Sequence, residues 1–180
     1  IFQADHLQGS GIASLTLAAG TAQGVLSPGT LQFTGNVTIG GLNSLTIDAS
    51  VVALTNSPKT SGPADCNVCL SANYIAFQGA GQAAAAPGNG VLTATAGMID
   101  INAGGSAGDI LSLAGVASAN FISTGDIRLG VPVVNLPNTT DPGVPQTGQL
   151  ITAGNLTLQA AQVYPVSDID YTLKSTGSKS

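Results

Sequence analysis

The sequence predicts an all-β protein built as a parallel β-helix, a solenoid of short strands stacked on one another. Three observations support this prediction: short alternating strand patterns, glycine-marked turns between them, and a nearly uncharged composition. The clearest unit is Ala153–Ala161, with the sequence Ala-Gly-Asn-Leu-Thr-Leu-Gln-Ala-Ala. In it Leu156 and Leu158 point to one face and Thr157 to the other, because side chains alternate along a strand. A strand this short buries little surface alone, so it requires neighbours of the same kind.

The composition also favours stacked β-structure. Charged residues make up 7% of the 180 residues, against about 25% in an ordinary globular domain, while 24 residues are Gly and 9 are Pro. All nine acidic residues are Asp, and the four bases are Lys59, Arg128, Lys174 and Lys179. Because the long charged side chains that favour helices are so scarce, we expect almost no α-helix.

The charge balance limits the classes of partner. The formal net charge is -5, which argues against nucleic acid or an anionic membrane, since both require clustered Lys and Arg. No apolar run approaches the roughly 20 residues that span a bilayer, so we expect no membrane insertion. The chain starts at Ile1 without an initiating Met or a signal-peptide pattern, and we interpret it as a piece of a longer, processed polypeptide.

The N-terminal part predicts five strands, each an alternating segment between turn residues. They are Leu15–Leu17, Leu31–Phe33, Val37–Ile39, Leu45–Ile47 and Val51–Ala53. Residues 56–70 then interrupt the pattern with Pro58, Gly62 and Pro63. Such residues are typical of turns, so we expect this stretch to be an excursion that leaves the stack.

The middle of the chain predicts one strand and a second excursion. Tyr74–Phe77 has strand character, and residues 79–90 then hold four consecutive alanines followed by Pro-Gly-Asn-Gly. The alanines could form one helical turn, but the helix breakers on both sides favour a loop.

The C-terminal half returns to the strand pattern, with a third excursion at residues 131–148, which hold four prolines. The predicted strands are Val91–Ala94, Met98–Ile101, Ile110–Leu113, Phe121–Ile122, Ile127–Leu129, Leu150–Ile151, Leu156–Leu158, Gln162–Tyr164 and Ile169–Tyr171. We expect residues 1–173 to form one fragment and the polar tail 174–180 to fray. A sandwich would show longer strands, spaced about 8 to 12 residues apart throughout.

The only cysteine pair is Cys66 and Cys69. A zinc site would require two further ligands, and the sole histidine, His6, lies far upstream with no partner. A thioredoxin-like redox site would require a helix that starts at the first cysteine. We therefore expect a small disulfide that shapes the first excursion, with two free thiols as the alternative.

Four aspartates sit next to predicted strands, namely Asp48, Asp100, Asp109 and Asp126. Asp100 and Arg128 each lie between two apolar residues, so both should point away from the core. Polysaccharide lyases and hydrolases with β-helical folds cluster such groups on one face. Because the sequence repeats no acidic cluster, we expect these residues to be solvated on the outer face, with no catalytic role and no metal.

Two segments resemble a known family. Thr124–Leu129 has the sequence Thr-Gly-Asp-Ile-Arg-Leu, and Ile151–Pro165 contains Gly-Asn-Leu-Thr-Leu. These units resemble the shaft of filamentous haemagglutinin-type adhesins, the large exoproteins of Gram-negative two-partner secretion systems. The similarity extends over most of the chain in style and is sharpest in these two segments.

The resemblance implies a right-handed β-helix, export through an outer-membrane two-partner secretion transporter, and a secreted or cell-surface location. Members of the family act in cell adhesion and virulence, or as stalks that present a toxin in contact-dependent inhibition. No catalytic residue or cofactor carries over. The cysteine pair and the proline-rich excursion depart from the family pattern, so any host or bacterial receptor or glycan is expected on the excursions, with Lys59, Asp65, Asn138 and Asp141 as candidates. The rival interpretation is a protein that binds or cleaves polysaccharide.

Overall fold

The computed structural model describes residues 11–19, 29–58, 66–81, 83–104, 110–131 and 146–176. In these residues the chain is all-β, with thirteen strands and no helix. Accordingly, the described part of the chain contains no helix that is long and apolar enough to cross a membrane. The strands are Ser14–Ala18 (β1), Thr30–Thr34 (β2), Val37–Asp48 (β3), Val51–Thr55 (β4), Val68–Gly79 (β5), Gly90–Ala103 (β6), Leu111–Ala114 (β7), Val116–Ser123 (β8), Asp126–Gly130 (β9), Gln146–Thr152 (β10), Asn155–Gln159 (β11), Gln162–Pro165 (β12) and Ile169–Ser175 (β13).

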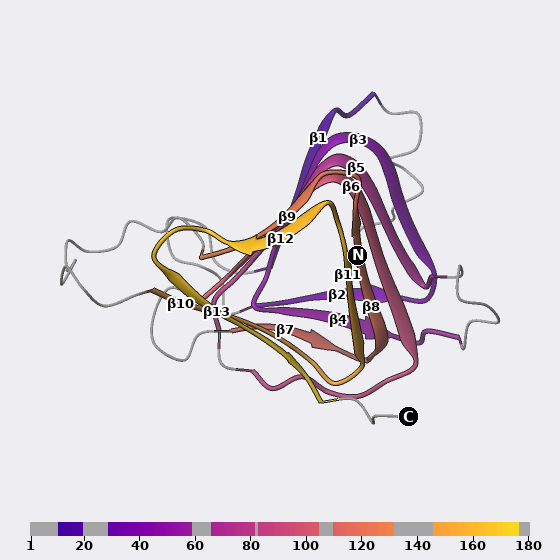
Figure 1. Cartoon of the computed structure of the whole chain (residues 1–180). Coiled ribbons are helices and arrows are strands. Elements are labelled where there is room, and N and C mark those ends of the chain that lie inside the picture. The colour runs from indigo at the N-terminus through magenta and orange to yellow at the C-terminus, as the bar shows by residue number, and fades with distance from the viewer. Residues whose placement is uncertain are drawn as a thin grey trace.

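The strands form two sheets, and every pairing between named strands is parallel. The larger sheet has the order β1-β3-β5-β6-β8-β11, with β9 paired to β6 and β12 paired to β9. The smaller sheet has the order β13-β10-β7-β4-β2. Figure 1 looks along the stack and shows the larger sheet on two sides of a three-sided outline and the smaller sheet on the third.

Successive passes of the chain around this outline form six strand layers. The first layer contains β1 and β2, the second β3 and β4, and the third β5. The fourth contains β6 and β7, the fifth β8 to β10, and the sixth β11 to β13. The long strands β3, β5 and β6 each turn a corner and so contribute to two sides of one layer (Figure 1). Pairs of predicted strands therefore merge: Val37–Ile39 and Leu45–Ile47 both lie in β3, with a register shift between Ile39 and Leu42.

The core is a continuous apolar interior between the three sides. Leu45, Ile75, Ile99 and Ile127 follow one another in register from layer to layer, and each is 0% exposed. Phe77 and Phe121 contact each other in the interior, with ring centroids 5.2 Å apart at an interplanar angle of 85°. This edge-to-face contact is a favourable arrangement for aromatic rings.

The third layer contributes no strand to the smaller sheet, because β4 pairs directly with β7. The chain instead crosses the outside of that sheet as the strap, which we define as residues 83–89 (Figure 1). The buried hydroxyl of Ser112 donates a hydrogen bond to the carbonyl of Ala83, and the Gly115 N–H donates to the Ala86 carbonyl at 2.8 Å. The second predicted excursion therefore covers part of the sheet with small residues.

The limits of the other excursions also differ from the sequence prediction. The first was expected over residues 56–70, but β5 begins at Val68, and Asn67 and Leu70 are only 1% exposed. The third was expected to end at residue 148, but β10 begins at Gln146, and β13 continues to Ser175 into the predicted tail. In each case a strand extends because its backbone pairs with a neighbouring layer.

Candidate functional site

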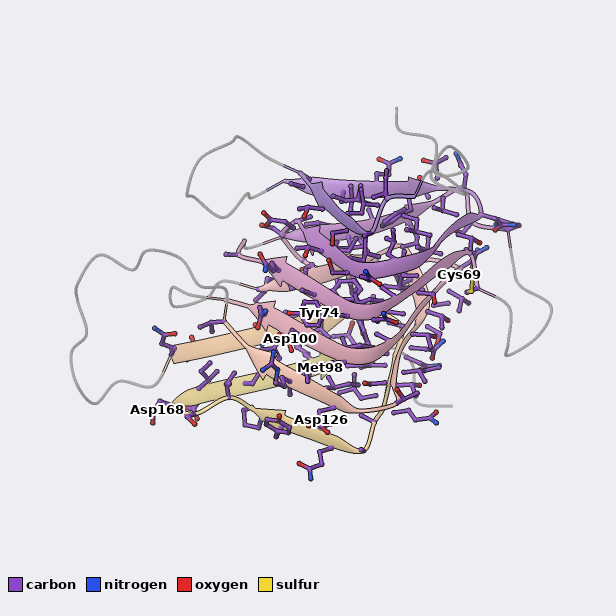
Figure 2. The ribbon with its side chains drawn as sticks, turned by 90° about the horizontal axis from the view of Figure 1, so that it is seen from above. Cys69, Tyr74, Met98, Asp100, Asp126 and Asp168 are labelled. Carbon is purple, nitrogen blue, oxygen red and sulfur yellow. A yellow bond between two sulfur atoms is a disulfide. The ribbon has the colours of Figure 1, made fainter. Side chains whose placement is uncertain are left out.

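A polar cluster lies on the outer face of the larger sheet, where β5, β6, β9 and β12 run side by side. We call it the outer cluster; its members are Tyr74, Asp100, Asp126, Arg128 and Tyr164. The pairing register places Asp100 beside Arg128, and Arg128 beside Tyr164. Figure 2 shows Tyr74, Asp100 and Asp126 along one side of the stack.

Asp100 and Arg128 form the centre of the outer cluster. Arg128 donates from Nε to Oδ1 of Asp100 at 2.7 Å and from Nη2 to Oδ2 at 2.6 Å. The Tyr74 hydroxyl donates to the same Oδ2 at 2.7 Å. The Asp100 side chain is only 9% exposed, whereas the Arg128 side chain is 38% exposed. Such a bidentate pair is among the stronger charge-assisted contacts in proteins.

Burial and charge shift the titration of the groups around Asp100. Desolvation, followed by the hydrogen bond to Asp100, raises the pKa of Tyr74 to about 12. The hydrogen bonds to Asp100 raise the pKa of Arg128 above its ordinary value. Tyr74 is therefore a neutral donor and Arg128 a cation at physiological pH.

The contacts within this cluster join side chains of neighbouring strands. Glycoside hydrolysis requires one carboxylic acid that carries a proton and one carboxylate that is free to act. Both oxygens of Asp100 are engaged by Arg128 and Tyr74. Asp126 is half-buried and accepts a long contact of 3.4 Å from the Tyr164 hydroxyl. The contacts of Asp100 instead connect three successive layers through β5, β6 and β9.

The structure brings together some of the charged residues that the sequence singled out. Asp100 and Arg128 point outward as expected, but the expectation that they are solvated is wrong for Asp100, because its two partners cover it. Asp48 is aligned with Gln78, away from Arg128, and has a buried Oδ1 without a hydrogen bond. Desolvation raises the pKa of Asp48. Asp109 lies outside the described residues.

Cys66 and Cys69 form a disulfide in the structure, with their Cα atoms 5.6 Å apart. Cys69 lies in β5, away from the outer cluster (Figure 2). Within the described ranges, no group of three or more His, Cys, Asp or Glu side chains could hold a metal ion. The loop candidates Lys59, Asp65, Asn138 and Asp141 lie outside the described residues.

Sequence reasoning missed Asn67, which is buried between the two cysteines. Its Nδ2 donates to Oδ1 of Asn36 and to the Pro58 carbonyl, and its Oδ1 accepts from the Val91 N–H, each at 2.9 Å. A signal was present, because an Asn-Val pair precedes a strand both at Asn36 and at Asn67. Equivalent residues of neighbouring layers therefore stack at this corner.

The contributions of Tyr74 and Tyr164 to the outer cluster were also missed. Two of the three tyrosines lie there, next to the single arginine of the chain.

Comparison with protein-family models, curated proteins and solved structures finds no match to this chain.

Proposed function

We propose that this chain is a shaft segment of a large secreted or surface-exposed bacterial adhesin, folded as a right-handed parallel β-helix. Its role is to extend the adhesin and to display the adhesin's other parts. The strand register carries the proposal. Residues of equivalent position align from β1 through β3, β5, β6 and β9 to β12, and all these strands are parallel. Right-handed connections are the general rule between parallel strands.

A structure of this kind lengthens without changing its cross-section. Each layer adds about 4.8 Å, and the interior grows as the layers are added. At about 25 cal/mol per Å² of buried apolar area, this interior compensates for the small number of charged residues in the sequence.

The resemblance to filamentous haemagglutinin-type exoproteins indicates how this shaft would be exported. Both units that carry it have the same local form on different sides of the outline: Gly125 immediately precedes β9, and Gly154 immediately precedes β11. Each unit is thus a corner glycine followed by an outward polar residue and a strand. We therefore include in the proposal export from a Gram-negative cell through a two-partner secretion transporter. A stalk of a contact-dependent inhibition toxin would use the same shaft.

Surface labelling of producing cells tests this function. An epitope inserted at Ala117, an exposed residue of β8, should be detected on intact cells that carry the partner transporter. Deletion of the transporter gene should abolish the signal while total protein remains. An epitope that stays inside cells with an active transporter would refute the proposal.

Polysaccharide binding by the outer cluster is a second candidate function. Tyr164, Arg128 and Asp126 combine an aromatic ring with charged hydrogen-bonding groups on an outward face. Purified chain should then be retained on one or more immobilised bacterial or host polysaccharides, and Tyr164→Ala should reduce retention. A Thr157→Ala variant, changed at an exposed position of β11, is the control. Equal retention of both variants would exclude the outer cluster.

A further inference from the structure

The strap, residues 83–89, differs from the short corners that the structure describes. At the corner of residues 124–125, both backbone N–H groups donate to carbonyls of the preceding layer. The strap forms no strand, and two of its backbone groups, the carbonyls of Ala83 and Ala86, accept hydrogen bonds from described residues. The strap is therefore hydrogen-bonded to the sheet at two points.

The strap presents small side chains at the surface. Four consecutive alanines, Ala83 to Ala86, are followed by Pro87. Ala83, Ala84 and Ala86 are exposed, and Ala85 is half-buried. Exposed segments of small residues outside regular structure are preferred sites of proteolytic cleavage.

The sequence of the strap fits one class of endopeptidase. Elastase-type serine endopeptidases have a small S1 pocket, which accepts alanine next to the bond that is cut. Three bonds of the strap have alanine on both sides, those that join Ala83 to Ala84, Ala84 to Ala85 and Ala85 to Ala86. The bond before Pro87 is a poor substrate, because the proline ring occupies the backbone nitrogen.

Opening of the strap leaves the sheet beneath it in place. The two donors that hold the strap are the Ser112 hydroxyl and the Gly115 N–H. Ser112 belongs to β7, which pairs with β4 and β10 and not with the strap. An extended peptide pairs its backbone with that of the protein that binds it. The strap becomes available for such pairing after the loss of two hydrogen bonds, whereas a strand of the stack would have to leave its sheet.

We propose that the strap is a cleavage site for an endopeptidase that accepts small aliphatic residues, and that the two halves of the chain stay assembled after the cut. Hydrolysis of one alanine–alanine bond consumes one water, breaks the C–N bond and leaves a carboxylate and an ammonium group. The inference requires only the stacked layers, and it does not depend on export or adhesion.

The pairing of β5 with β6 explains why the halves stay together. The cut separates these two strands in sequence, but they pair with each other on both sides of the corner that they share. Ile75 and Ile99, which are aligned across this pairing, are both 0% exposed in the apolar interior. Separation of the halves would expose this interior to water, at a high cost in free energy.

Limited proteolysis of the native chain with pancreatic elastase tests the inference. Mass spectrometry should find new N-termini at Ala84, Ala85 or Ala86. The two fragments should elute together in size-exclusion chromatography and separate only in urea. A folded chain that is not cut within residues 83–86 would overturn the cleavage site. Fragments that separate without denaturant would overturn the assembly of the halves.

A proline variant tests the position of the cut. Ala84→Pro/Ala86→Pro removes every alanine–alanine bond of the strap. The N–H groups of Ala84 and Ala86 donate to no described residue, so the two prolines leave both carbonyl contacts possible. This variant should resist elastase within residues 83–87, and continued cleavage there would contradict the assignment of these bonds.

Two serine variants test whether the cut requires opening of the strap. Ser112→Ala removes the hydroxyl that holds Ala83, so cleavage in the strap should become about fivefold faster, as the loss of one hydrogen bond predicts. The control Ser123→Ala removes another buried hydroxyl, which donates to the carbonyl of Gly97 in β6. This control should be cut at the wild-type rate. Equal rates in the two variants would overturn cleavage through the opened strap.

Discussion

The guanidinium of Arg128 forms two parallel hydrogen bonds with the carboxylate of Asp100, at 2.7 and 2.6 Å, from the adjacent strand of the outer face. Among the described residues, Asp100 and Arg128 form the one salt bridge. Tyr74 adds a third bond to the same carboxylate from the preceding layer. In a chain with so few charges, this contact joins side chains of β5, β6 and β9.

Replacement of Arg128 should therefore destabilise the fold. Arg128→Leu leaves the buried carboxylate of Asp100 with Tyr74 alone, and we expect a loss of about 2 kcal/mol, lower than for a fully buried pair because Arg128 is partly hydrated. Asp100→Asn/Arg128→Leu should cost less than the single change, because no charge stays buried. Urea unfolding measures both, with Lys174→Leu at an exposed position as the control. Equal stability of Arg128→Leu and wild type would contradict the bracing role.

Stability should fall at alkaline pH because of Tyr74. Its pKa is raised from 10.0 to about 12 in the folded chain, so below pH 10 the hydroxyl is protonated in both states and its contribution is complete. Between pH 10 and about 12 the unfolded chain ionises first, and this contribution is lost. Burial also raises the pKa of Tyr171, so Tyr74→Phe should remove part of the loss. Urea unfolding from neutral pH to about pH 12 tests this; an unchanged slope in Tyr74→Phe would argue against it.

Asn67 should matter more than the cysteines on either side of it. Asn67→Ala leaves the Val91 N–H and the Pro58 carbonyl without their partner, and we expect a cost of about 3 kcal/mol. Cys66→Ser/Cys69→Ser opens only a short loop and should cost about 1 to 2 kcal/mol. As a control, exposed Asn73 makes one bond of 3.3 Å, to Asn43, and Asn73→Ala should be nearly neutral. The opposite ranking, measured by thermal unfolding, would refute this prediction.

Two glycines with similar backbone angles should respond differently to alanine. Gly35 has φ +73° with open space at its Cβ position, so Gly35→Ala should cost only the left-handed backbone penalty of about 1 kcal/mol. Gly115 has φ +71°, but its Cβ would collide with the Leu54 carbonyl oxygen. Gly115→Ala should therefore cost more than about 3 kcal/mol. Similar unfolding midpoints for the two variants would show that the corner at Gly115 is not closely packed.

The strand positions were predictable because the alternation of side chains is a local property. The predicted segments Leu15–Leu17, Leu156–Leu158 and Ile169–Tyr171 all lie within strands of the structure. What local sequence could not show is that glycines such as Gly97 turn a strand around a corner without ending it. There the backbone of β6 continues to pair with its neighbours on both sides of the corner.

The outer cluster was only partly predictable. Alternation correctly oriented Asp100 and Arg128, but their pairing depends on register. Aligned residues are separated by unequal lengths of chain: Ile75 is aligned with Ile99, while Ile127 is aligned with Val163, a longer interval. These intervals depend on the excursions, whose lengths follow no repeat, so the sequence alone could not identify the neighbours.

The strap has a consequence for the shape of the molecule. From the first layer to the last, the side formed by β1, β3, β5, β6, β9 and β12 has one strand more than the side formed by β2, β4, β7, β10 and β13. The second side is therefore shorter by one strand spacing, about 4.8 Å. This difference in length favours a curve of the stack toward the smaller sheet near the strap.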